Sequence, residues 1–183
     1  MDFGNIGIYN FIGAFGELSY FLGAFSKSSQ VLIFSVALSG FLYFIHGILT
    51  GNNPTSIDGV LTFIYYCLFI EFKYKGKVYS AHSFLGSRLS KYIDLILLIT
   101  KLVLMSIFFK ESRDFLIMIA AYFLYLVPRQ KELYREKLYC GVVNLLWCFY
   151  FVSGSFYLEF LTQIAVAATY FIKSSYSYRK EKK

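Results

Sequence analysis

The sequence is poor in charged residues and in proline. Only 16% of the 183 residues are charged and two are proline, whereas 57% are apolar and 21% are aromatic. A soluble domain of this length has too small an interior to bury so much apolar surface. The composition therefore argues against an ordinary soluble domain and indicates a chain whose apolar side chains lie in a lipid bilayer.

Motifs for common catalytic and metal sites are also missing. His46 and His82 are the only histidines, neither belongs to an HExxH motif, and no GxSxG motif is present. The three cysteines, Cys67, Cys140 and Cys148, lack metal-ligand spacing and lie in apolar segments, which favours reduced thiols. We therefore expect no enzyme activity, no metal site and no cofactor.

Apolar blocks of membrane-spanning length follow one another along the chain. A helix needs roughly 17 to 25 apolar residues to cross a hydrocarbon core about 30 Å thick. Polar, glycine-containing or charged segments separate the blocks. Asp2 precedes the first block without a basic region, so we expect a retained helix and not a cleaved signal. The predicted helices span residues 7–25, 30–50, 57–72, 92–109, 115–128, 138–153 and 156–173.

The positions of the basic residues predict the topology. All but three of the 18 Lys and Arg residues fall in segments that a seven-helix chain places on one side of the membrane. The exceptions are Lys110 and Arg113 on the opposite side and Lys101 within a helix. Basic loops face the cytosol, so we expect the N-terminus outside and the C-terminus in the cytosol. The net charge of +7 is thereby explained without a nucleic-acid partner.

The order of elements indicates an internal repeat within a single membrane domain. Residues 7–72 and 115–173 each contain three predicted helices with a short cytosolic loop and then a minimal outer turn. The helix at 92–109 links the two units, and residues 174–183 form a basic cytosolic tail. We therefore predict an all-α, polytopic fold over residues 1–183, built from two three-helix repeats and a linker helix.

The two repeats can be aligned at their second helices. Tyr43 to Gly51 matches Trp147 to Ser155 at an offset of 104 residues, with apolar and aromatic positions in common and few identities. Both units start outside, so they would be parallel repeats related by an axis along the membrane normal. A path for a solute would then lie between them near the membrane midplane.

Two charged residues lie near the centres of predicted helices. Glu17 is in the first helix and Lys101 is in the linker helix, at similar predicted depth. Charged groups in a span cost roughly 2.5 to 3.5 kcal/mol on insertion scales, so they usually contact protein or a wet cavity. We expect an intramembrane Glu17–Lys101 ion pair. A protonatable Glu17 that drives transport, or separate contacts for the two groups, are the alternatives.

The second predicted helix has a polar face. Ser39, Tyr43, His46 and Thr50 follow the spacing i, i+4, i+7 and i+11, which places them on one side of a helix. This pattern is typical of a cavity wall. His46 would act there as a proton acceptor or ligand contact, or alternatively as a packing hydrogen-bonding group.

Other polar residues in the later helices suggest a binding site. Asn144 and Trp147 lie one turn apart in the sixth helix and Gln163 lies in the seventh, although hydrogen bonding between helices explains the amides equally well. We expect these residues and the polar face to meet in one cavity that suits a small neutral or cationic polar solute. The predicted substrate-binding residues are Tyr43, His46, Thr62, Asn144, Trp147 and Gln163.

Four stretches carry a resemblance to known families. They are GELSYFLGAF (Gly16 to Phe25), GFLYFIHGILTG (Gly40 to Gly51), NLLWCFYFVSGS (Asn144 to Ser155) and LVPRQKELYREK (Leu126 to Lys137). In its length and in the local sequence of these stretches, the chain resembles the YgjV-type bacterial inner-membrane proteins. Its layout of three helices, a linker and three helices resembles the SWEET sugar transporters and the PnuC vitamin transporters, and the last stretch is similar to the proline-containing helix end of PQ-loop transporters.

The resemblance implies a bacterial inner-membrane location, a transporter fold and a hinge at Pro128. The first repeat lacks a matching proline, and Thr62 and Gln163 are the nearest polar residues to the asparagines that SWEET transporters use. Our leading hypothesis is a small-solute transporter or facilitator of unknown substrate. The alternative is a membrane component that carries no solute. It would bind a protein partner at its cytosolic loops or sense the state of the bilayer, either as a single chain or as a homo-oligomer.

Overall fold

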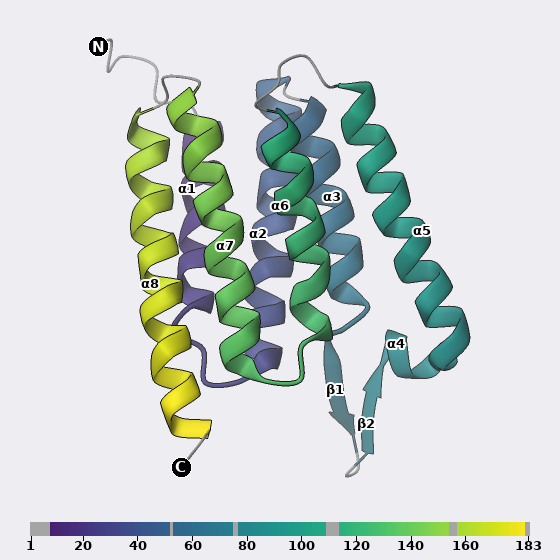
Figure 1. Ribbon diagram of the computed structural model, residues 1–183. Coiled ribbons are helices and arrows are strands. Elements are labelled where there is room, and N and C mark those ends of the chain that lie inside the picture. Colours follow the sequence, from purple (N-terminus) through teal and green to yellow (C-terminus); the bar gives the residue numbers. More distant parts are fainter. Residues whose placement is uncertain (1–7, 52, 75–76, 109–113, 154–156, 182–183) are drawn as a thin grey trace.

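Seven helices of 13 to 25 residues dominate the computed structural model, and Figure 1 shows them side by side in one bundle. The structure describes residues 8–51, 53–74, 77–108, 114–153 and 157–181. These helices are α1 (Ile8–Gly23), α2 (Ser29–Thr50), α3 (Asn53–Cys67), α5 (Gly86–Ile107), α6 (Asp114–Leu126), α7 (Leu133–Ser153) and α8 (Tyr157–Glu181). The seven predicted helices are thus all present.

The segment between α3 and α5 differs from the prediction. The third helix ends at Cys67, and a small antiparallel hairpin follows, made of β1 (Glu71–Tyr74) and β2 (Lys77–Ser80). Large apolar side chains alternate with charged ones around Phe72 and Tyr74, which is the period of a strand. After the short helix α4 (Ala81–Phe84), the linker helix begins at Gly86 and not at residue 92.

The last helix is also longer than predicted. Residues 174–181 continue α8, so that the predicted basic tail is helical up to Glu181. Hydrogen bonds to α7 hold this extension. The Ser174 hydroxyl donates to the carbonyl of Tyr134, and Lys137 donates to both the Ser177 hydroxyl and the Ser26 carbonyl.

Helix α2 lies very close to α3 because glycines form the contact. A Cβ atom on Gly59 would lie 2.5 Å from the backbone nitrogen of Phe44 and 2.7 Å from the carbonyl oxygen of Gly40. No real Cβ atom tolerates such distances to backbone atoms. Small residues that let helix backbones approach are typical of helix pairs in membranes.

Tyrosine hydroxyls connect other helices in the interior. Tyr66 donates to the carbonyl of Leu124, which joins α3 to α6, and Tyr170 donates to the carbonyl of Tyr20, which joins α8 to α1. Both tyrosines are fully buried. A buried phenol needs a hydrogen-bond partner, and helix carbonyls near the α3–α6 and α1–α8 contacts supply it.

One end of the bundle carries the hairpin and the C-terminal end of α8, and we call it the hairpin end (Figure 1). The start of α1 lies at the opposite end. Exposed basic residues at the hairpin end come from separate elements, and these residues are Lys27, Lys131, Arg135, Arg179 and Lys180.

Among the described residues, only α2 is both long and apolar enough to cross a membrane by itself. Helices α1, α3 and α6 have 16, 15 and 13 described residues, which is short of 18. The segment from Phe115 to Arg129 is a shorter apolar helix. A single such helix is a weak indication of membrane association, because the core helix of a soluble protein has the same length and composition.

Candidate functional site

Glu17 is held by polar side chains from two neighbouring helices. The Gln163 amide on α8 donates to the Glu17 carboxylate over 2.6 Å, and the Tyr43 hydroxyl on α2 also hydrogen-bonds to Glu17. Gln163 is buried, and Glu17 and Tyr43 are half-buried. The arrangement brings helices α1, α2 and α8 together around one carboxylate.

Lys101 has a different acidic partner from the predicted one. Its ammonium group lies 2.6 Å from the Asp58 carboxylate and donates to the Thr62 hydroxyl over 2.7 Å. The predicted pair with Glu17 is therefore wrong. The reason is geometric, because Asp58 and Thr62 lie one helical turn apart on α3, which packs directly on α5, whereas Glu17 lies on α1.

Tyr43 interacts with residues of both clusters. Besides bonding to Glu17, its hydroxyl is close enough to Asp58 for that carboxylate to act on it electrostatically. Polar side chains from α8, α1, α2, α3 and α5 therefore follow one another across the bundle. We call this set the polar layer, and its residues are Glu17, Tyr43, Asp58, Thr62, Lys101 and Gln163.

The polar layer contains three of the six residues predicted to bind a substrate, namely Tyr43, Thr62 and Gln163. His46 lies one turn further along α2, and its ring packs against Gly13 of α1. The remaining two make contacts within α7. The Asn144 amide donates to the carbonyl of Cys140 over 2.6 Å, and the Trp147 ring meets Tyr150 edge-on.

A small cavity lies between α3, α5 and α6. Its volume is about 20 Å³, which is room for about one water molecule. Thr62 and Lys101 line it, together with Tyr65, Tyr125 and apolar side chains. Of the six predicted binding residues, only Thr62 lines this cavity.

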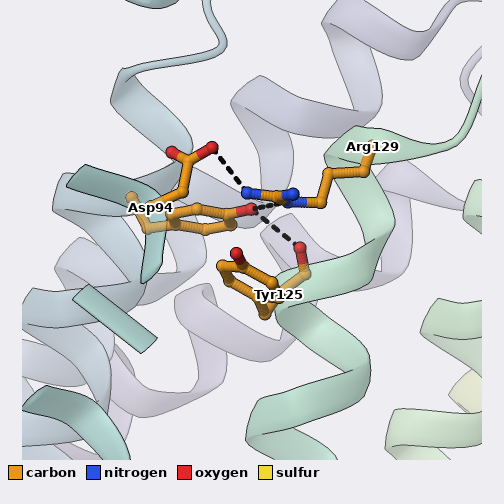
Figure 2. A network of polar contacts seen from close by, with 4 residues as sticks. Asp94, Tyr125 and Arg129 are labelled. Carbon is orange, nitrogen blue, oxygen red and sulfur yellow. Dashed lines mark hydrogen bonds and ion pairs between the residues drawn. The ribbon is translucent and has the colours of Figure 1, made fainter. Parts of the chain in front are cut away.

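A second polar network lies beside this cavity, toward the hairpin end. The Arg129 guanidinium donates to the Asp94 carboxylate over 2.6 Å and to the Tyr65 hydroxyl over 3.2 Å. Figure 2 shows Arg129 between Asp94 and Tyr125, and its guanidinium carbon lies 4.2 Å from the centre of the Tyr125 ring. Burial lowers the pKa of Arg129, but the Tyr65 hydrogen bond, Tyr125 and Asp94 outweigh burial and raise that pKa above its ordinary value.

Pro128 lies in this network region. It belongs to a 3₁₀ turn, η2 (Val127–Arg129), which ends α6 and carries Arg129 toward α5. Proline suits this position because it cannot continue the α-helix. The proline thus sets the place from which Arg129 reaches Asp94, and the predicted hinge action at Pro128 stays a prediction.

Asp58, Asp94 and Arg129 were not among the predicted site residues, although each pairs with an opposite charge. Arg129 was counted only among the basic residues that define the cytosolic side, and no partner was predicted for either aspartate. A usable signal was present in α5, where Asp94 and Lys101 are seven residues apart and therefore share a helical face. Two opposite charges on one apolar helix need two separate partners.

Comparisons with protein families, with curated proteins and with solved structures find no match to this chain. Within the described residues, no three His, Cys, Asp or Glu side chains form a group that could hold a metal ion.

Proposed function

We propose that the chain is an integral membrane protein that crosses the bilayer seven times. The distribution of side chains supports this proposal. Asp94 and Lys101 are 1% and 7% exposed, whereas Ile107 and Ile172 are each 67% exposed. Charged groups inside and large apolar groups outside are the reverse of a soluble protein, and exposed apolar surface on this scale fits contact with lipid.

The proposed orientation follows from the charge at the two ends. The hairpin end carries the exposed basic residues of several separate elements, and basic segments stay in the cytosol. The proposal therefore places the N-terminus outside and the C-terminus in the cytosol of a bacterial inner membrane, in agreement with the resemblance to YgjV-type proteins.

We further propose that the protein transports or facilitates the passage of a small polar solute. The polar layer is the observation that carries this proposal. A helix bundle in lipid gains little from burying two carboxylates and an ammonium group, because each must be desolvated. A row of such groups across five helices is instead expected where a polar solute or an ion must find partners.

The proposed roles follow from the chemistry of the layer. Glu17, Tyr43 and Gln163 offer a carboxylate, a phenol and an amide, which together suit a neutral or cationic solute with hydrogen-bond donors. The Oε1 atom of Gln163 is buried and has no hydrogen-bond partner among the described residues, so it can accept a bond from such a solute. Lys101, Asp58 and Thr62 hold the linker helix beside this group.

Solute passage can be measured by stopped-flow light scattering of proteoliposomes. The probes are glycerol, xylitol, glucose and choline chloride, which cover neutral and cationic solutes of increasing size. We expect at least one probe to enter faster than into empty liposomes. The acceleration should be lost in Glu17→Gln and Gln163→Leu, and kept in Thr169→Val, a control on α8 whose hydroxyl bonds only to its own helix.

A second candidate function is a membrane component that binds a partner or senses the bilayer without carrying solute. The observation in its favour is that the polar layer has little room for a solute. Lys101 already pairs with Asp58 and hydrogen-bonds to Thr62, and the adjoining cavity has a volume of only about 20 Å³. Entry rates equal to those of empty liposomes for all four probes, with folded and correctly inserted protein, would favour this candidate over transport.

A further inference from the structure

The inner face of α5 is unusually polar. Ser90, Asp94 and Lys101 are all buried and follow the spacing i, i+4 and i+11, so they share one face of the helix. The opposite face exposes Leu95, Ile96 and Ile99 and is proposed to contact lipid. A helix that served only as a connector would need no ionised groups on its buried face, since apolar packing costs less.

Each of the two charges on that face has a partner on another element. Lys101 pairs with Asp58 of α3, and Asp94 pairs with Arg129 of η2, each over 2.6 Å. The cavity between α3, α5 and α6 lies between these two ion pairs, with Lys101 and Thr62 on its wall. Tyr65 and Tyr125 also line the cavity and contact Arg129, so the Arg129 network is directly adjacent to it.

The hydrogen bonds of this network divide into two groups. The Tyr65 hydroxyl donates to the carbonyl of Tyr125 over 2.7 Å, which joins α3 to α6 without involving α5. The bond from Arg129 to Asp94 joins the end of α6 to α5. Breaking the second bond therefore loosens α5 only toward its hairpin end, because Lys101 still pairs with Asp58 of α3, while the Tyr65 bond keeps α3 and α6 together.

Arg129 and Asp94 also differ in their access to solvent. The Asp94 side chain is 1% exposed, whereas the Arg129 side chain is 31% exposed. The guanidinium already lies at the border of the bundle and can turn outward into water. The carboxylate cannot reach water unless α5 moves.

We propose that the Asp94–Arg129 pair is a gate at the hairpin end of the space between α3 and α6. This proposal rests on the proposed function, because the gate would control access from the cytosol to the polar layer. In the closed state, the pair holds α5 against α3 and α6 and covers the cavity beside Lys101 and Thr62. When Arg129 turns outward, α5 separates at its hairpin end and opens a route from the cytosol to that cavity.

The gate can be tested through the accessibility of a cysteine in the cavity. Ala121 lines the cavity and is 2% exposed, and a cysteine there would add a single sulfur atom to the side chain. We would place Ala121→Cys in a chain in which Cys67, Cys140 and Cys148 are replaced by alanine. The reagent is a charged, membrane-impermeant thiosulfonate added to inside-out vesicles, which expose the proposed cytosolic end.

We expect slow modification of the parent and at least tenfold faster modification when Arg129→Gln removes the pair. Asp94→Asn combined with Arg129→Gln removes both charges without leaving a buried carboxylate, and should react equally fast. The control is Arg135→Gln, which breaks an exposed pair with Glu132 at the same end and should react at the parent rate. Size-exclusion chromatography of each variant checks that it is folded.

Equal rates in the parent and in the folded double variant would overturn the gate, because the pair would then only hold the helices together. This measurement needs no solute. Failure of every probe to enter proteoliposomes would contradict the proposed transport and leave the difference in thiol modification unchanged, so the two failures can be told apart.

Discussion

Helices α2 and α5 have the same length, 22 residues, but the rest of the bundle holds them in different ways. The apolar helix α2 contacts α3 through glycine backbones, and both of its ends are capped, by Ser28 and by Gly51 in a left-handed conformation with φ of 68°. The N-cap residue of α5, Leu85, makes no side-chain capping bond, and ion pairs at Asp94 and Lys101 hold the helix.

This difference indicates a fixed region and a movable one. Close backbone packing depends on many short contacts and is lost all at once, so the α2–α3 pair is expected to stay together. An ion pair can be broken and re-formed by rotating one side chain. The linker helix α5 therefore has the attachment that a gate requires.

The largest effect is expected at the glycine contact. Gly59→Ala places a methyl group against backbone atoms of α2 that cannot move aside, and should lower the free energy of unfolding by roughly 3 kcal/mol. Gly141→Ala is the matched control, because its nearest neighbours are atoms of the movable Phe171 ring, and should cost less than about 1 kcal/mol. Unfolding in increasing detergent, followed by circular dichroism, measures both. Equal losses would contradict the fixed character of α2 and α3.

A smaller effect is expected at the Lys101 pair. Lys101→Met leaves Asp58 without its cation and should destabilise the protein by roughly 2 kcal/mol, less than a fully buried pair because the Asp58 side chain is 20% exposed. Adding Asp58→Asn should recover part of this loss, as a double-mutant cycle would measure. Strictly additive losses would mean that the two groups do not stabilise each other.

Removal of the Tyr65 hydroxyl should have a still smaller effect. Tyr65→Phe keeps the stacked contact with Tyr125 but deletes the bond to its carbonyl and the bond from Arg129. A typical hydrogen bond contributes about 1 kcal/mol, and we expect a loss of that order. The same unfolding titration measures it, and an unchanged midpoint would show that the hydroxyl does not join α3 to α6.

The smallest effect is expected at the surface. Arg135→Gln breaks an exposed pair with Glu132, in which the nitrogen and oxygen atoms are 3.1 Å apart. Such exposed pairs contribute little to stability, because water and salt screen them. A loss as large as that of Lys101→Met would remove the distinction between structural and surface charges on which the comparison depends.

The sequence predicted the helices better than their contacts. Apolar blocks and polar breaks located all seven helices, since both follow from local composition. The hairpin at Glu71–Ser80 was missed because charged residues there were interpreted only as a cytosolic loop, although their alternation with aromatic residues was visible. The extension of α8 was missed because a basic tail carries no apolar period.

The partners of charged residues could not be predicted from depth alone. Glu17 and Lys101 were paired because they lie near the centres of their helices, but depth does not say which helices are neighbours. The structure places α5 on α3 and α6, so Asp58 and not Glu17 meets Lys101. Tyr43, Thr62 and Gln163 lie in the polar layer, whereas the amide of Asn144 bonds to its own helix, and binding of a substrate by these residues stays a prediction.

The central claim is that the bundle spans a membrane with its hairpin end in the cytosol. Cysteine labelling tests it most directly, with Thr50→Cys and Lys131→Cys each placed in a cysteine-free chain, since both positions are exposed and lie at opposite ends of the bundle. An impermeant maleimide on intact spheroplasts should label position 50 and not position 131, and inside-out vesicles should give the reverse. Labelling of both positions from the same side, or recovery of the protein in the soluble fraction, would contradict the account.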